Sequence, residues 1–132
     1  MKKHGILNAD LARAVAAMGH RDLLVIGDAG MPAPRGVPII DLALREGVPG
    51  FLETLATVLE ELRVEEGVIA EEMARTSPAL RAAFAGTWPR DADLREVRHE
   101  DLKRLTADAK ALVRTGEFTP YANVVLVAGV VF

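Results

Sequence analysis

The chain has 132 residues, of which 50% are hydrophobic and 27% charged, and its formal net charge is -3. These values fit one ordinary globular domain, spanning residues 1–132, with a single core. The slightly acidic balance gives no clustered basic surface for phosphates, so no nucleic-acid partner is expected. The absence of cysteine excludes disulfides, thiolate metal sites and thiol nucleophiles.

The sequence also predicts a protein without an export signal or a membrane span. Near the amino terminus the apolar run at residues 23–26 is too short for a signal core. The most apolar stretch, residues 124–132, is about nine residues long, whereas a spanning helix needs about twenty. We therefore expect a cytoplasmic protein that does not cross a membrane.

The first half of the chain alternates between helical and strand patterns. A helix is predicted over residues 9–18, with an N-cap side chain before it and a glycine after it. An apolar run at residues 23–26 predicts a buried strand, which leads directly into a Gly-Asp-Ala-Gly turn. A short strand follows at residues 39–42, and a second helix begins near Pro49.

The second half continues this alternation. Its predicted elements are a strand at 68–70, a helix capped by Ser77, a strand at 94–97, a helix at 100–107, and strands at 111–113 and 124–132. Parallel neighbours need crossover connections, and helices usually supply them. The order therefore predicts a single three-layer α/β domain with a mostly parallel central sheet and helices on both faces.

Polar residues that could carry chemistry stand mostly at the ends of predicted strands. Asp28 and His99 each follow a strand, where open α/β sheets bind their ligands. Tyr121 and Asn123 carry a hydroxyl and an amide that suit sugar hydroxyls, although a Pro-Tyr turn with an Asn cap explains them equally well. His20 reaches the same crevice only if the chain turns inward after the first helix. Its position alone favours an interaction with the helix dipole.

Several common catalytic arrangements have no support in the sequence. Ser77 is the only serine, and its Ser-Pro setting already explains it as a helix cap. No glycine pattern for a nucleotide cofactor is present, and the three histidines show no metal-binding spacing. We therefore expect neither a cofactor nor a metal. Metal-dependent lyase or isomerase chemistry, using His20, His99 and a carboxylate, stays open as an alternative.

Short motifs spread along the chain point to a known family. They are Lys2-Lys3-His4-Gly5-Ile6-Leu7-Asn8, Gly19-His20 with Asp22, Asp28-Ala29-Gly30-Met31-Pro32, Asp41-Leu42-Ala43-Leu44, Ala70-Glu71-Glu72, Arg114-Thr115-Gly116-Glu117 and Thr119-Pro120-Tyr121-Ala122-Asn123. With these motifs the chain resembles the D-ribose pyranase branch of the ribose pyranase and fucose mutarotase superfamily. The resemblance is weakest over residues 79–95.

The resemblance implies an isomerase that interconverts the β-pyranose and β-furanose forms of D-ribose by cofactor-free acid/base ring opening and reclosure. His20 matches the proton-donating catalytic histidine of the family. Asp28, His99 and the segment Tyr121-Ala122-Asn123 match its substrate-binding positions. The family forms rings with sites near subunit contacts, so the resemblance also implies a ring-like homo-oligomer, either a pentamer or a decamer.

Two further alternatives to this function stay open. One is a mutarotase that exchanges the anomers of fucose or another sugar. The other is a non-catalytic sugar-binding subunit. Fucose mutarotases tend to have Tyr-Gly-Asn where this chain has Tyr121-Ala122-Asn123, so Ala122 favours ribose.

Overall fold

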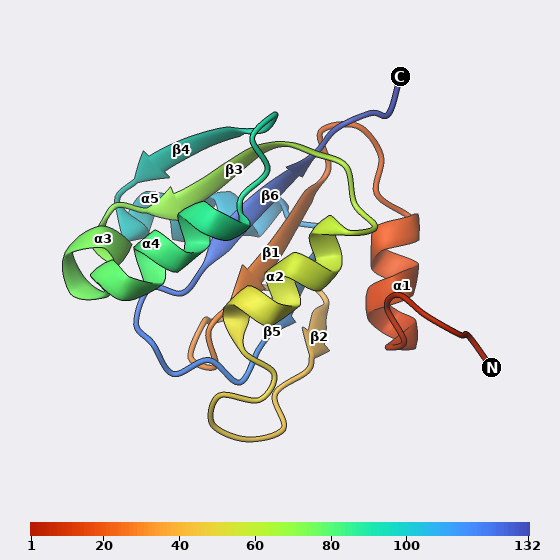
Figure 1. Cartoon of the computed structure of the whole chain (residues 1–132), viewed down its shortest axis with the longest axis horizontal. Coiled ribbons are helices and arrows are strands. Elements are labelled where there is room, and N and C mark those ends of the chain that lie inside the picture. Colours follow the sequence, from red (N-terminus) through yellow and green to blue (C-terminus); the bar gives the residue numbers. More distant parts are fainter.

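The computed structural model describes all residues from 1 to 132. At its centre is a six-stranded sheet in the order β2-β5-β1-β6-β3-β4 (Figure 1). The strands are β1 (Leu23–Gly27), β2 (Ile39–Asp41), β3 (Val64–Ala70), β4 (Asp93–Val97), β5 (Ala111–Arg114) and β6 (Val124–Ala128). The helices are α1 (Ala9–Ala16), α2 (Phe51–Leu59), α3 (Glu72–Thr76), α4 (Pro78–Thr87), α5 (His99–Leu105) and the 3-10 turn η1 (Thr106–Asp108).

The sheet is mostly parallel, as predicted, with one exception. Strands β2, β5 and β1 pair in parallel, and so do β3 and β4. Strand β6 lies between β1 and β3 and is antiparallel to both. The residues just before β6 therefore lie beside the carboxyl ends of all the other strands.

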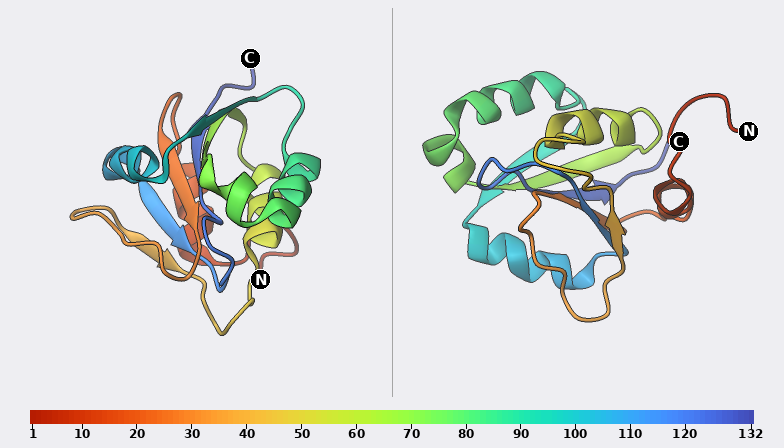
Figure 2. Two further views of the ribbon diagram at one scale, coloured as in Figure 1. Left: turned by 90° about the vertical axis from the view of Figure 1, so that its left-hand side faces the viewer. Right: turned by 90° about the horizontal axis from the view of Figure 1, so that it is seen from below.

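Both faces of the sheet are covered, which explains the continuous apolar runs in the sequence. In β1, Leu24 and Ile26 pack into one core cluster, while Val25 between them packs into the other. The first cluster lies under α1, α2 and α4, and the second lies under α5. Figure 2 shows α2 and α4 on one side of the sheet and α5 on the other. The predicted three-layer α/β fold is therefore confirmed.

Local details both support and correct the sequence analysis. The side chain of Asn8 caps α1 by accepting the N–H of Leu11 at 2.9 Å. Ser77 occupies the N-cap position of α4, but its hydroxyl donates to the carbonyl of Pro120 at 3.4 Å instead of capping the helix. The last strand ends at Ala128, short of the predicted residue 132. No helix combines the length and the apolarity that crossing a membrane requires.

Candidate active site

Polar side chains from distant parts of the sequence lie together at the carboxyl ends of the parallel strands. Asp28 directly follows β1, and His99 is the second residue after the end of β4. The segment 121–123 directly precedes β6, whose reversed direction brings it to the same edge. Asp28 and His99 thus stand at strand ends, as their sequence positions predict.

Asp28 and Asn123 form a two-way hydrogen-bonded pair at this edge. The Asp28 N–H donates to Oδ1 of Asn123 at 2.9 Å, and Nδ2 of Asn123 donates to Oδ2 of Asp28 at 2.9 Å. The other carboxylate oxygen accepts the N–H of Gly30, also at 2.9 Å. Asn123 is only 1% exposed, so its amide is fixed by burial as well as by these bonds. Each carboxylate oxygen of Asp28 keeps a further lone pair for a ligand.

The close approach of these two residues depends on Gly27. A Cβ atom at this position would lie 3.0 Å from Oδ1 of Asn123 and 2.8 Å from Cβ of Met31. The Gly27 carbonyl accepts both the N–H and the hydroxyl of Thr115, at 3.0 and 2.8 Å. The absence of a side chain at Gly27 therefore lets the end of β1 pack closely against Met31, Asn123 and Thr115.

Tyr121 and His99 form an aromatic pair that adjoins this site. Their ring centroids are 5.1 Å apart with an interplanar angle of 81°, an edge-to-face arrangement. Tyr121 has a φ of 63°, a left-handed conformation that is uncommon for a bulky residue. The backbone N–H of His99 donates to both carboxylate oxygens of Glu72, at 3.1 and 3.0 Å. The Nδ1 atom of His99 is buried and has no hydrogen-bond partner, which is unusual for a buried polar atom.

A hollow of about 370 Å³ opens beside Asp28, between residues 28–30 and residues 117–120. Glu117 fixes its second wall by accepting hydrogen bonds from the Thr119 hydroxyl at 2.7 Å, the Thr119 N–H at 3.1 Å and the Phe51 N–H at 3.2 Å. Burial raises the pKa of Glu117, but these hydrogen bonds outweigh it and leave the pKa below its usual value. The wall is therefore built around an ionised carboxylate.

His20 lies at the opposite edge of the sheet. It precedes β1 in a turn that Asp22 closes by accepting the N–H of Gly19 at 2.8 Å. The five residues of β1 span about 13 Å, and His20 and Asp28 lie beyond its two ends. His20 does not reach the Asp28 crevice of its own chain. The connection from α1 enters β1 at its amino end, whereas Asp28 follows its carboxyl end.

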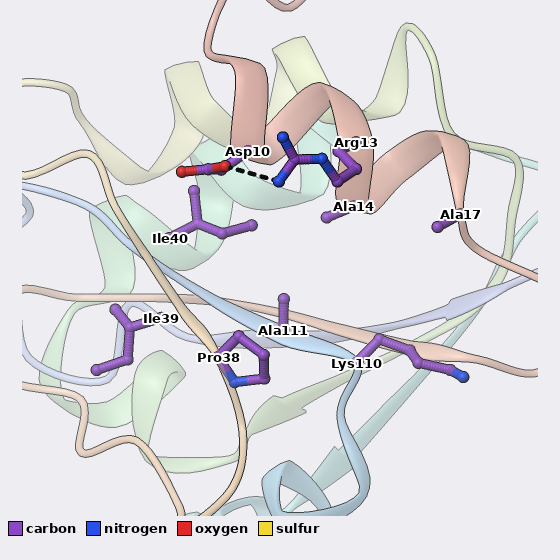
Figure 3. Close-up of a pocket in the computed structure, with 9 residues that line it drawn as sticks. All are labelled: Asp10, Arg13, Ala14, Ala17, Pro38, Ile39, Ile40, Lys110 and Ala111. Carbon is purple, nitrogen blue, oxygen red and sulfur yellow. Dashed lines mark hydrogen bonds and ion pairs between the residues drawn. The ribbon is translucent and has the colours of Figure 1, made fainter.

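A second hollow, of about 430 Å³, lies between α1 and the edge strand β2 (Figure 3). Its lining includes the apolar side chains of Ala14, Ile40 and Ala111. The one carboxylate in its lining, Asp10, is paired with Arg13 at 3.1 Å. It offers a sugar fewer free acceptors than the hollow beside Asp28, so we place the candidate site at Asp28. No group of three or more His, Asp or Glu side chains could hold a metal ion.

Sequence reasoning did not assign three acidic residues that shape these regions. Glu72 and Glu117 occur in the sequence analysis only within motifs. Glu65 contacts the ring of His20 at 3.0 Å. Neither Glu65 nor Glu117 could be assigned from the local sequence, since the partners of both meet them only through the tertiary structure.

The model of the RbsD / FucU transport protein family matches residues 1–131. The chain belongs to this family. A D-ribose pyranase from Symbiobacterium thermophilum is 53% identical over 135 residues, and the match covers all of both chains. The structure of Bacillus subtilis RbsD complexed with D-ribose has a TM-score of 0.95 and 47% identity, again over all of both chains. The fucose mutarotase in complex with L-fucose from Streptococcus pneumoniae has a TM-score of 0.79 at 24% identity, covering 99% of this chain and 100% of that chain, which is a likeness of fold alone. The resemblance drawn from the motifs is confirmed.

Proposed function

We propose that this protein is a cytoplasmic isomerase that interconverts the β-pyranose and β-furanose forms of D-ribose without a cofactor. The full-length similarity to D-ribose pyranases supports this reaction. The structural observation that carries it is the rigid Asp28–Asn123 pair beside a hollow of about 370 Å³. D-ribose presents hydroxyls and a ring oxygen, which carboxylate, amide, imidazole and phenol groups can all bind.

The reaction moves protons and rearranges bonds within one molecule. In ring opening, the anomeric hydroxyl loses its proton, the ring oxygen gains one, and the bond between C1 and the ring oxygen breaks to give an aldehyde. In reclosure, the C4 hydroxyl attacks that aldehyde, loses its proton and leaves a new anomeric hydroxyl. No atom is gained or lost, so a positioned acid/base group suffices, and such a group typically contributes about 10²–10⁴-fold.

In this proposal His20 is the proton carrier, because an imidazole exchanges protons readily near neutral pH. Asp28 orients a sugar hydroxyl through the lone pairs that Gly30 and Asn123 leave free. His99 and Tyr121 hold the sugar, with the unpartnered Nδ1 of His99 as a hydrogen-bond partner. Ala122 is fully buried and serves by fixing the turn between Tyr121 and Asn123.

The position of His20 leads us to propose that each site is shared by two copies of the chain. His20 and Asp28 lie beyond opposite ends of β1, and the side chain of His20 is 52% exposed. A His20 from a second copy can enter the Asp28 crevice if the amino edge of one sheet faces the carboxyl edge of the next. Such a head-to-tail contact is heterologous, and it closes into a ring when the rotation permits.

Exposed apolar side chains at both ends of the molecule support this assembly. Phe118, which lines the hollow beside Asp28, is 63% exposed, and Leu44 is 78% exposed. Near the His20 edge, beyond β6, Val131 and Phe132 are 86% and 101% exposed. Such large exposed apolar side chains would be covered if each end of the molecule met another copy of the chain. We accordingly propose a ring-like homo-oligomer, a pentamer or a decamer, with D-ribose as the small-molecule partner.

Exchange spectra resolved by substrate test this function. NMR magnetisation transfer between the β-pyranose and β-furanose signals of D-ribose should show an enhanced rate with the protein. Faster exchange between the anomers of fucose, without pyranose-to-furanose exchange of ribose, would instead identify a mutarotase. Binding of D-ribose without faster exchange of any kind would identify a non-catalytic sugar-binding subunit.

A further inference from the structure

Glu65 sits at an irregularity in β3. The pairing of β3 with β6 shifts register between Val64 and Glu66, so Glu65 is an extra residue in the strand. Such a bulge changes the direction in which a side chain points. Gly129 lies against it, and a Cβ atom there would lie 3.1 Å from Cβ of Glu65 and 3.3 Å from its backbone nitrogen. The bulge and the glycine together give Glu65 its place at the edge of the sheet.

The carboxylate of Glu65 points at the His20 turn. Its Oε2 atom lies 3.0 Å from Nε2 of His20, and its Oε1 atom accepts a hydrogen bond from Nη1 of Arg21 at 2.6 Å. Arg21 has a φ of 70°, so a non-glycine residue adopts the left-handed conformation directly after His20. Its N–H donates to the Ala128 carbonyl at 2.8 Å. The turn that carries His20 is thus held by both backbone and side-chain contacts.

We propose that Glu65 is the positioning residue of the proton carrier: it holds the Nε2–H of His20 and leaves Nδ1 to exchange protons with the sugar. The inference rests on the proposed role of His20. An ionised carboxylate only accepts hydrogen bonds, so the ring nitrogen that faces it must carry a proton. The other nitrogen is then the one that gains and loses the transferred proton, while Glu65 fixes the ring plane.

The ionisation of Glu65 agrees with this arrangement. The hydrogen bond from Arg21, followed by that from His20, holds the pKa of Glu65 below its usual value. Glu65 is therefore a carboxylate throughout the range in which an imidazole exchanges protons. Arg21 balances its charge without contacting the His20 ring, so the imidazole keeps one free nitrogen.

The test combines kinetics with a spectroscopic readout of the imidazole. In protein labelled with ¹⁵N-histidine, the His20 signals are identified by their loss in His20→Ala. At a pH where the ring is neutral, the wild-type protein should show the Nε2–H tautomer, and Glu65→Ala should show a mixture. Because misplacing a catalytic group by about 1 Å costs about 10²-fold, kcat for ribose exchange should fall by about that factor in Glu65→Ala, with KM changed less than about twofold. Glu65→Gln should keep the tautomer, since its amide oxygen still accepts, and lose less activity.

Glu66→Ala is the matched control. Glu66 pairs with Arg95 at 3.1 Å and lies 3.8 Å from Arg21, but it makes no hydrogen bond or ion pair with His20. It should keep the wild-type kcat and tautomer. Wild-type kcat in Glu65→Ala, an Nδ1–H tautomer in the wild type, or an equal loss in Glu66→Ala would overturn the inference. A fully active His20→Ala would overturn the proposed role of His20 itself, whereas an inactive His20→Ala beside an active Glu65→Ala overturns only the role of Glu65.

Discussion

Two inactive variants of this chain should restore each other's activity when their subunits are mixed. His20→Ala keeps the Asp28 crevice but lacks the proton carrier. Asp28→Asn keeps His20 and the shape of the crevice but loses the carboxylate that Asn123 and Gly30 hold. Suppose that each His20 serves the crevice of a neighbouring copy. In an equal random mixture, half of the contacts between copies then contain an intact His20, and in half of those contacts the facing crevice has an intact Asp28. The mixture should then regain about one quarter of wild-type activity.

The assay is NMR exchange of D-ribose on oligomers assembled from the two variants together. A tag on one variant, followed by mass spectrometry of the purified oligomer, verifies that both kinds of subunit are present. Each variant assembled alone is the control and should stay near the uncatalysed rate. If the verified mixed oligomers stay inactive, His20 and Asp28 do not act across a contact between copies and the shared site is refuted.

Two further predictions concern the supports of the site. Gly27→Ala should lower the free energy of unfolding by about 1–3 kcal/mol, because its Cβ would overlap Met31 and crowd Asn123. Urea unfolding measures this, and Gly86→Ala, where a Cβ meets nothing within 4 Å, should instead stabilise the helix by about 0.5–1 kcal/mol; equal losses in both would contradict the packing argument. Glu117→Gln should destabilise the protein at pH 7 by about 1–2 kcal/mol. Since the folded-state pKa of Glu117 is lowered, its contribution is present above its ordinary pKa and lost as the pH falls through the folded value. The difference between Glu117→Gln and wild type should therefore shrink in urea titrations at pH 3, and a constant difference would contradict this.

The sequence predicts the layers of this fold well because burial leaves a direct mark on composition. The run that contains Leu24, Val25 and Ile26 is continuous because both faces of the sheet are covered. Asp28 could be placed for the same reason, since it follows that run at the end of a strand. What pattern cannot supply is the direction of a strand, and the insertion of β6 antiparallel between β1 and β3 is visible only in the structure.

The same limit applies to the site. Tyr121 adopts a left-handed conformation that its residue type does not favour, and the Asn123 N–H donates to its carbonyl at 2.8 Å. His20 could be named from the motif, but its contact with Glu65 could not be predicted, because β3 is distant in the sequence. Its neighbour Glu65 comes from a bulge 45 residues away. Such contacts arise from topology, which local periodicity does not encode.

The most direct test of the proposed function is the rate of β-pyranose to β-furanose exchange of D-ribose in the presence of a strong chelator. We expect the wild-type protein to accelerate this exchange equally with and without the chelator, and the rate of His20→Ala to fall by about 10²–10⁴-fold towards the uncatalysed rate. Loss of wild-type activity on chelation would indicate metal-dependent chemistry. A His20→Ala variant that retained the wild-type rate would contradict the role of His20 as the proton carrier.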